Sequence, residues 1–355
     1  MRLSEAALGK NNNFNLIRFL AAFAVLVSHS FLISTGIWNS EPLRSSYGLT
    51  WGDIAVNVFF VTSGFLVTAS LLSRRNAIAF VQARALRIYP ALLVMLILVV
   101  FVMGSALTAE SLREYLGARQ TWHYFVKNAL LVAGINYELP GLFVSNPFKL
   151  SVNDSLWTLV YEVHMYVALL VIWLVCRGSR AFTMVVVGCA IVSGAIYLWG
   201  GHFEPASQYS RLGFMFFTGA GFYVLRSRIV LYRAAFAALA GAVAISLLQR
   251  ETFFFVLSFS LAYLLMYSAY AFGGAIRAFN RVGDYSYGIY IYAYPVQQSL
   301  TSVFKGISTL DLMMFSATVT LGLAALSWHL IERRALSLKG RTPQEVALQP
   351  LCKAM

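Results

Sequence analysis

Long apolar runs alternate with short polar segments along almost the whole of this chain. Each run is about as long as a helix that crosses the ~30 Å hydrocarbon core of a bilayer. The pattern predicts an all-α polytopic membrane protein with about ten transmembrane helices, formed by residues 1–340 and followed by a short tail over residues 341–355. The runs cover residues 14–34, 53–73, 87–106, 155–176, 182–200, 208–225, 229–248, 252–271, 285–304 and 311–331.

Composition supports this fold class, and the charge distribution adds an orientation. Hydrophobic residues make up 59% and charged residues 12% of the chain, whereas soluble domains carry about 25% charged residues. The net charge of +13 comes from arginines and lysines that gather in alternate connections, among them Arg74, Arg75 and Arg177. By the positive-inside rule these connections and both termini are cytoplasmic. The charge therefore reflects topology, and we expect membrane lipid around the protein and no nucleic acid as a partner.

The first run carries two ionisable residues, Arg18 and His29. They are 11 residues apart, which on a helix is about three turns and ~16 Å of rise, so both lie on one face. Ionisable groups inside a spanning helix are costly and usually face a bundle interior or a wet cavity, which makes both residues candidates for function. The alternative is an arginine that reaches the headgroups and a histidine that only hydrogen-bonds within the bundle.

The third run begins with a pair of arginines, Arg84 and Arg87, followed by Ile88-Tyr89-Pro90. At positions i and i+3 they share one face of a helix at its predicted cytoplasmic end. Two guanidinium groups side by side suit phosphate or pyrophosphate, which each can bind with two hydrogen bonds. Contact with lipid phosphate is the alternative interpretation.

The fourth run contains a carboxylate, Glu162, at a depth similar to that of His29 if both helices span the membrane. A carboxylate that accepts a hydrogen bond from one imidazole nitrogen raises the basicity of the other. We therefore expect Glu162 to orient His29, with a purely structural carboxylate as the alternative. Tyr166 follows at i+4 on the same face, while His164 points elsewhere and is interpreted as structural.

Polar residues in later runs extend the list of candidates. Arg211 lies at the outer end of the sixth run and could hold an acidic ligand or a lipid headgroup. Tyr287, Tyr290 and Tyr294 fall near one face of the ninth run, where they could line a polar tunnel or form part of an interfacial belt. Glu332 ends the tenth run beside two arginines, where a surface ion pair is expected.

The longest connection, residues 107–154, is predicted to lie on the outer side. Its apolar segment 122–134 is too short to span the membrane, so we expect an interfacial or re-entrant helix there. A connection of this length in a compact protein is usually functional or partly ordered.

Taken together in chain order, six short stretches resemble the membrane acyltransferase-three family, which includes polysaccharide and peptidoglycan O-acetyltransferases. The resemblance implies an O-acyltransferase of the bacterial cytoplasmic (inner) membrane. Such an enzyme moves an acyl group, most commonly acetyl, from cytoplasmic acetyl-CoA to a hydroxyl of a cell-surface or lipid-linked polysaccharide. The stretches are Arg18-x10-His29, residues 59–65, Arg84-x2-Arg87 with Ile88-x-Pro90, residues 157–166, residues 286–295 and residues 328–332.

The resemblance also implies roles for individual residues. Arg18, Arg84 and Arg87 are carried over as acyl-CoA-binding or pore-lining residues and His29 as the catalytic histidine, acting either as a general base or as a covalent acyl carrier. Glu162 and Glu332 match acidic positions of the family, whereas Asn57 and Ala293 replace the Asp and His of many members. No metal is expected, because the three cysteines are unclustered and show no spacing typical of metal ligands.

The rival interpretation is a proton-coupled transporter or exporter in which Arg18, His29 and Glu162 form a proton relay. The Arg84 and Arg87 pair argues against it, because a proton relay needs no cytoplasmic phosphate clamp. Binding or hydrolysis of acetyl-CoA by the purified protein distinguishes the two functions.

Overall fold

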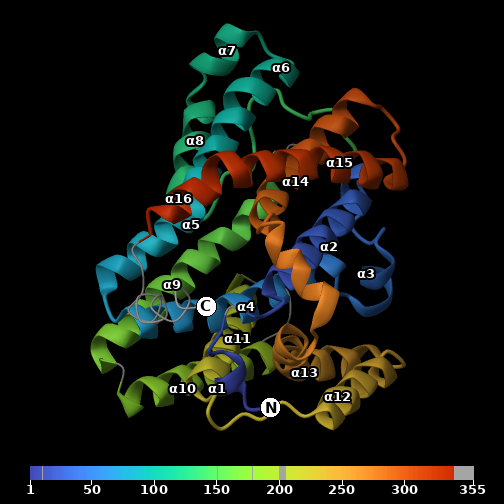
Figure 1. Ribbon diagram of the computed structural model, residues 1–355. Helices are drawn as coiled ribbons and strands as arrows, with labels where there is room; N and C mark the ends of the chain where they lie inside the picture. Colours follow the sequence, from blue (N-terminus) through green and yellow to red (C-terminus); the bar gives the residue numbers. More distant parts are fainter. Residues whose placement is uncertain (10, 150, 178, 200–204, 340–355) are drawn as a thin grey trace.

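The computed structural model describes residues 1–339 except for 10, 150, 178 and 200–204, and its regular elements there are all helices (Figure 1). The predicted tail over residues 341–355 lies outside the described residues. The first half of the helices are α1 (Leu3–Ala6), α2 (Phe14–Thr35), α3 (Pro42–Tyr47), α4 (Trp51–Arg74), α5 (Ala77–Ile97), η1 (Leu98–Gly104), α6 (Ser105–Leu107), α7 (Leu112–Gly117), α8 (Arg119–Leu130), η2 (Asp154–Leu156) and α9 (Trp157–Cys176). The remainder are α10 (Arg180–Trp199), α11 (Pro205–Val224), α12 (Arg233–Ser246), α13 (Arg250–Ala271), η3 (Gly274–Arg281), α14 (Ser286–Val303), α15 (Thr309–Ser327), η4 (Trp328–Glu332) and α16 (Arg333–Ser337).

The predicted all-helical membrane architecture is confirmed, and each predicted apolar run contains a helix among the described residues. Seven helices in the described part of the chain are long and apolar enough to cross a membrane. The other three runs form α11, α12 and α14; α12 has only 14 residues, and α11 and α14 carry many polar residues. The protein is therefore an integral membrane protein, while the count of about ten spans and the cytoplasmic termini stay predictions.

Polar contacts define two opposite ends of the bundle. At the first end, where α2 begins, the Asn13 side chain donates to the carbonyls of Ser268 (3.0 Å) and Phe272 (2.9 Å). At the second end, where α2 ends, the hydroxyls of Ser34 and Thr309 are 2.8 Å apart. Figure 1 shows α2 running between these ends with α14 and α15 beside it.

Glycines bring α4 and α11 into direct backbone contact. A Cβ atom on Gly64 would lie 1.9 Å from the carbonyl oxygen of Phe216, and one on Gly219 would lie 2.0 Å from that of Val61. Small residues permit such close approach of helices in membranes. The two glycines therefore let α11 pack directly against α4.

The described part of the long connection folds back onto the bundle. Its predicted short helix is confirmed as α8, and the side chain of Asn128 then fixes the return of the chain by donating to the Asn136 carbonyl (2.9 Å) and accepting from the Asn136 N–H (2.8 Å). Further on, the Asn146 amide donates to the Gln298 side chain (2.8 Å) on α14. The connection therefore helps to hold α14 in place at the second end.

Candidate active site

A buried ionic cluster lies at the first end of the bundle. The same Asp284 oxygen, Oδ2, is 2.6 Å from Arg87 Nη2 and 3.3 Å from Arg18 Nη1. Burial by itself would raise the pKa of Asp284, but the two guanidinium groups and the hydrogen bonds from Ser286 outweigh it and lower the pKa to about 2. Asp284 is therefore ionised at neutral pH and holds the two arginines together.

Glu332 belongs to this cluster, so the expected surface ion pair is wrong. Its side chain is only 2% exposed, with Oε2 3.4 Å from Arg87 Nη1, while Oε1 accepts from the Ser327 hydroxyl (3.0 Å). The residue ends a π-helical stretch, η4. A π-helical turn adds a residue to the helix and rotates the turns after it, and such turns are frequent at functional sites. Here the π-helical turn ends at Glu332, whose carboxylate faces the interior of the bundle.

The two arginines of the predicted phosphate clamp diverge. Arg87 turns into the bundle toward Asp284 and Glu332, whereas the Arg84 guanidinium carbon lies 5.7 Å over the ring of Tyr166. The buried Nε of Arg84 has no hydrogen-bond partner in the described part of the chain. Arg84 also lines a groove of about 160 Å³ between α5 and α9, together with Tyr166 and Leu170. The charge of Arg87 is thus balanced by two carboxylates, whereas that of Arg84 is not balanced by an ion pair in the described part of the chain.

Deeper in the bundle, Arg18 and Glu162 line a narrow cavity of about 30 Å³ together with Tyr287 and Tyr290. The Tyr290 hydroxyl is 2.5 Å from that of Thr158, and the Tyr287 hydroxyl donates to the carbonyl of Ile88 (2.8 Å). The structure thus brings two of the three candidate tyrosines to a polar interior. The cavity is about the size of a single water molecule.

Glu162 is held by neighbours other than His29. One of its oxygens accepts hydrogen bonds from the hydroxyls of Ser63 (2.8 Å) and Tyr166. The expected hydrogen bond to His29 is absent in the described part of the chain, because this carboxylate is turned toward Ser63 on α4 and along its own helix. A catalytic role for Glu162 stays a prediction.

His29 lies in a half-buried position further along α2. Its ring packs edge-on against Tyr294, with the ring centres 5.0 Å apart, and its buried Nδ1 has no hydrogen-bond partner among the described residues. Tyr294, the third candidate tyrosine, therefore contacts the candidate catalytic residue rather than the narrow cavity.

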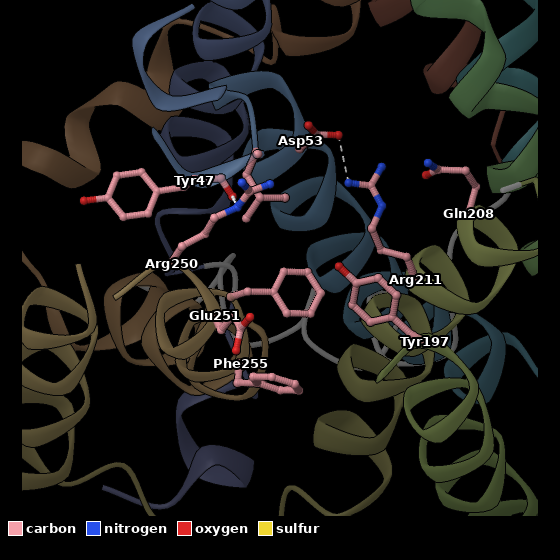
Figure 2. Close-up of a pocket in the computed structure, with 11 residues that line it drawn as sticks. Tyr47, Asp53, Tyr197, Gln208, Arg211, Arg250, Glu251 and Phe255 are labelled. Atoms are coloured by element: carbon pink, nitrogen blue, oxygen red, sulfur yellow. Dashed lines mark hydrogen bonds and ion pairs between the residues drawn. The ribbon is translucent and has the colours of Figure 1, made fainter. Parts of the chain in front are cut away.

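Arg211 forms an ion pair at the second end with Asp53 (2.9 Å; Figure 2). The other Asp53 oxygen accepts from the Thr50 N–H (3.0 Å) and hydroxyl (2.8 Å) in a capping box that begins α4. This cap fixes the carboxylate at the start of the helix. Asp53 therefore joins the start of α4 to Arg211 on α11.

Two acidic residues of the site, Asp53 and Asp284, were missed by reasoning from the sequence. The Thr-x-x-Asp capping pattern was a signal for Asp53, and Asp284 directly precedes the tyrosine-rich ninth run. By contrast, His164 is structural as expected: Nδ1 lies 3.0 Å from the Tyr209 hydroxyl and Nε2 2.9 Å from the Val132 carbonyl oxygen. Within the described ranges, no three His, Cys, Asp or Glu side chains come close enough to hold a metal ion.

Comparison with known proteins shows which family this chain belongs to. The family described as an acyltransferase domain, the acyltransferase-3 family, matches residues 11–330. An "O-acetyl transferase" of Shigella phage Sf6 is 29% identical over 359 residues, covering 92% of this chain and 97% of that protein. "Nodulation protein 10" of Rhizobium leguminosarum bv. viciae is 30% identical over 376 residues, covering 95% and 96% respectively. No solved structure matches the chain significantly.

Proposed function

Starting from its membership of the acyltransferase-3 family, which makes this chain an acyltransferase, we propose that it transfers an acetyl group across the membrane. The donor is cytoplasmic acetyl-CoA and the acceptor is a hydroxyl of a cell-surface or lipid-linked polysaccharide. The enzyme resides in the bacterial inner membrane with the first end of the bundle in the cytoplasm. The O-acetyl transferase of phage Sf6 supports the choice of acetyl and of an oxygen acceptor.

The observation that carries the proposal is the order of chemistry along α2. Arg18 lies in the ionic cluster at the first end, and His29 follows 11 residues later, ~16 Å further along the helix axis. That distance is comparable to the length of an extended pantetheine arm. A donor whose phosphates stay at the first end can therefore present its thioester to His29.

At the first end, Arg84 and Arg87 hold the phosphates of the donor. The guanidinium Nε of Arg84 has no hydrogen-bond partner among the residues that the structure describes, so it can donate to a phosphate oxygen. Guanidinium groups bind phosphate with paired, charge-assisted hydrogen bonds. Arg87 and Arg18 are already held by Asp284. Asp284 positions them for the donor and keeps their charges balanced until it binds.

His29 carries out the chemistry at the other end of this passage. As a general base, it takes the proton of the acceptor hydroxyl while the hydroxyl oxygen attacks the thioester carbonyl and the CoA thiolate leaves. As a nucleophile, it first forms an acyl-imidazole, releases CoA and then passes the acyl group to the hydroxyl. Both routes need an imidazole nitrogen without a competing hydrogen bond, and Nδ1 of His29 has no partner within the described ranges of the chain.

The passage between the two ends must widen during the reaction. The cavity beside Arg18 and Glu162 measures only about 30 Å³, which is room for one water molecule and not for a pantetheine chain. Tyr287 and Tyr290 close it from α14. Movement of α14 relative to α9 opens the route.

The experiment is acetyl-CoA consumption by the purified protein in proteoliposomes with a crude glycan acceptor. We expect wild type to turn over, His29→Ala to bind acetyl-CoA without turnover, and Arg84→Ala to bind it more weakly. Gln82→Leu, an exposed change on the same helix as Arg84, serves as the matched control and keeps full activity. A wild-type protein that neither binds nor consumes acetyl-CoA contradicts the proposal and favours proton-coupled transport.

A further inference from the structure

A second, larger cavity opens at the second end of the bundle. It has a volume of about 470 Å³, within the range of about 300–1,000 Å³ typical of small-molecule sites. Figure 2 shows side chains from several helices converging on it, with the guanidinium of Arg211 between Asp53 and Gln208 and the rings of Tyr197 and Phe255 below. We call it the outer pocket.

The polar wall of the outer pocket has unused hydrogen-bonding capacity. Arg211 is 5% exposed; its Nη1 contacts Asp53, yet its Nε and Nη2 have no hydrogen-bond partner among the described residues. The buried Oε1 of Gln208 is also without one there. Buried polar atoms in native proteins are almost always paired, so an unpaired set at one place requires an explanation. Two donors and an acceptor at one wall match a ligand whose groups both donate and accept, as hydroxyl groups do.

Charge indicates that this ligand is neutral. The pocket is lined by two arginines, Arg211 and Arg250, and by two carboxylates, Asp53 and Glu251, so the formal charges cancel. A site for an anion would show a surplus of positive charge. The remaining wall contains the rings of Tyr197, Phe254 and Phe255, which offer flat apolar surface to the carbon-bound hydrogens of a sugar ring.

The outer pocket is connected to the candidate base. Asp53 lines the pocket, and it lies at the start of α4, next to the part of α2 that carries His29. The helices that carry them touch closely here, since a Cβ atom on Gly52 would lie 3.0 Å from the Ser28 hydroxyl oxygen. A ligand in the pocket therefore lies on the side of His29 opposite to the arginines of the first end.

From these observations we infer that the outer pocket binds a neutral sugar unit of the acceptor, with Arg211 donating to its oxygens and Gln208 accepting from a hydroxyl. The inference rests on the proposed function and specifies its acceptor class. Asp53 holds the Arg211 guanidinium in place through their ion pair.

The test measures sugar binding without any acyl donor. Saturation-transfer NMR on the detergent-solubilised full chain uses methyl β-D-glucopyranoside, methyl β-D-galactopyranoside and methyl N-acetyl-β-D-glucosaminide, with methyl β-D-glucuronide as the acidic counterpart. We expect at least one neutral glycoside to bind and to be competed by the others, and the glucuronide to bind at least ten times more weakly. Gln208→Leu and Arg211→Lys should each weaken binding of the neutral glycoside about tenfold or more.

Controls separate a folding defect and a failure of the proposed function from a failure of this inference. Gln82→Leu should bind the glycosides like wild type, and Gln208→Leu should keep wild-type acetyl-CoA binding, which shows that it folds. Equal glycoside binding by Gln208→Leu and Gln82→Leu overturns the inference, and so does a preference for the glucuronide. If wild type binds the glycosides but does not turn over acetyl-CoA, the transferase proposal is rejected and the sugar-binding pocket stands.

Discussion

Replacing Arg87 by alanine should destabilise the protein far more than replacing Arg84, although both arginines are predicted to serve the donor. The Arg87 side chain is 11% exposed and sits against Asp284, 13% exposed, and Glu332, 2% exposed. Its removal leaves Asp284 with Arg18 at 3.3 Å as its remaining ion pair in the described part of the chain, and Glu332 with a hydrogen bond from Ser327.

The magnitude comes from the burial of the acids left behind. Removing one member of a buried ion pair costs about 3–5 kcal/mol, since an uncompensated charge stays in the interior. Arg84 has no such acid among the described residues, and loses with alanine only its contact with the Tyr166 ring, which contributes about 0.5–2 kcal/mol. The free energy of unfolding should therefore separate the two variants by about 1–4.5 kcal/mol.

The assay is reversible unfolding by sodium dodecyl sulfate in mixed micelles, followed by circular dichroism, for both variants and for Arg87→Ala/Glu332→Gln. Because the second change removes the stranded charge, the double variant should recover part of the stability lost by Arg87→Ala. Arg44→Ala, which removes an arginine lying over the Trp38 ring at 4.3 Å, is the control for loss of an arginine in a ring contact alone. Equal stability of the Arg87→Ala and Arg84→Ala variants would refute the reasoning.

Two further predictions concern stability. The folded-state pKa of Asp284, about 2, lies below its ordinary value of 3.8. The ionised carboxylate therefore contributes about 2 kcal/mol to the free energy of unfolding above pH 4, and this contribution is lost as the pH falls toward 2. Acid unfolding of wild type and Asp284→Asn tests this, and parallel stability curves for the two proteins would contradict it. Gly64→Ala should destabilise the protein by about 1–3 kcal/mol through a clash with the Phe216 carbonyl. Gly221→Ala is the control and should be neutral or stabilising, because a Cβ atom on Gly221 meets nothing within 4 Å among the described residues. Similar thermal midpoints for the two variants would be the contrary result.

Features set within a single helix could be predicted from the sequence. Local composition predicts the apolar helices, and the helix period places Arg18 and His29 on one face of one helix. The structure has both residues on the continuous helix α2. The close approach of α4 and α11 was signalled by a small residue, Gly64, in an apolar run. Periodicity sufficed for these features because each has a local cause.

The direction of charged side chains depended instead on residues far away in the chain. Arg84 and Arg87 share a helical face, yet Arg87 is drawn to Asp284, 197 positions later, and no local pattern identifies that acid as its partner. The contact between Glu162 and His29 is predicted from their similar depth in the membrane. Depth does not fix the rotation of a helix about its axis, and α9 is rotated so that the Glu162 carboxylate faces Ser63. Pairings between distant segments need the packed structure.

In the proposed reaction, the acyl donor and the acceptor reach His29 from opposite ends of the bundle. The most direct measurement encloses radiolabelled acetyl-CoA inside sealed proteoliposomes and supplies the methyl glycoside only outside, with a parallel sample in which both are outside. We expect labelled O-acetyl glycoside in the first sample, none with His29→Ala, and little product in the second. If product forms only when donor and acceptor share one side of the membrane, the two substrates do not reach His29 from opposite ends.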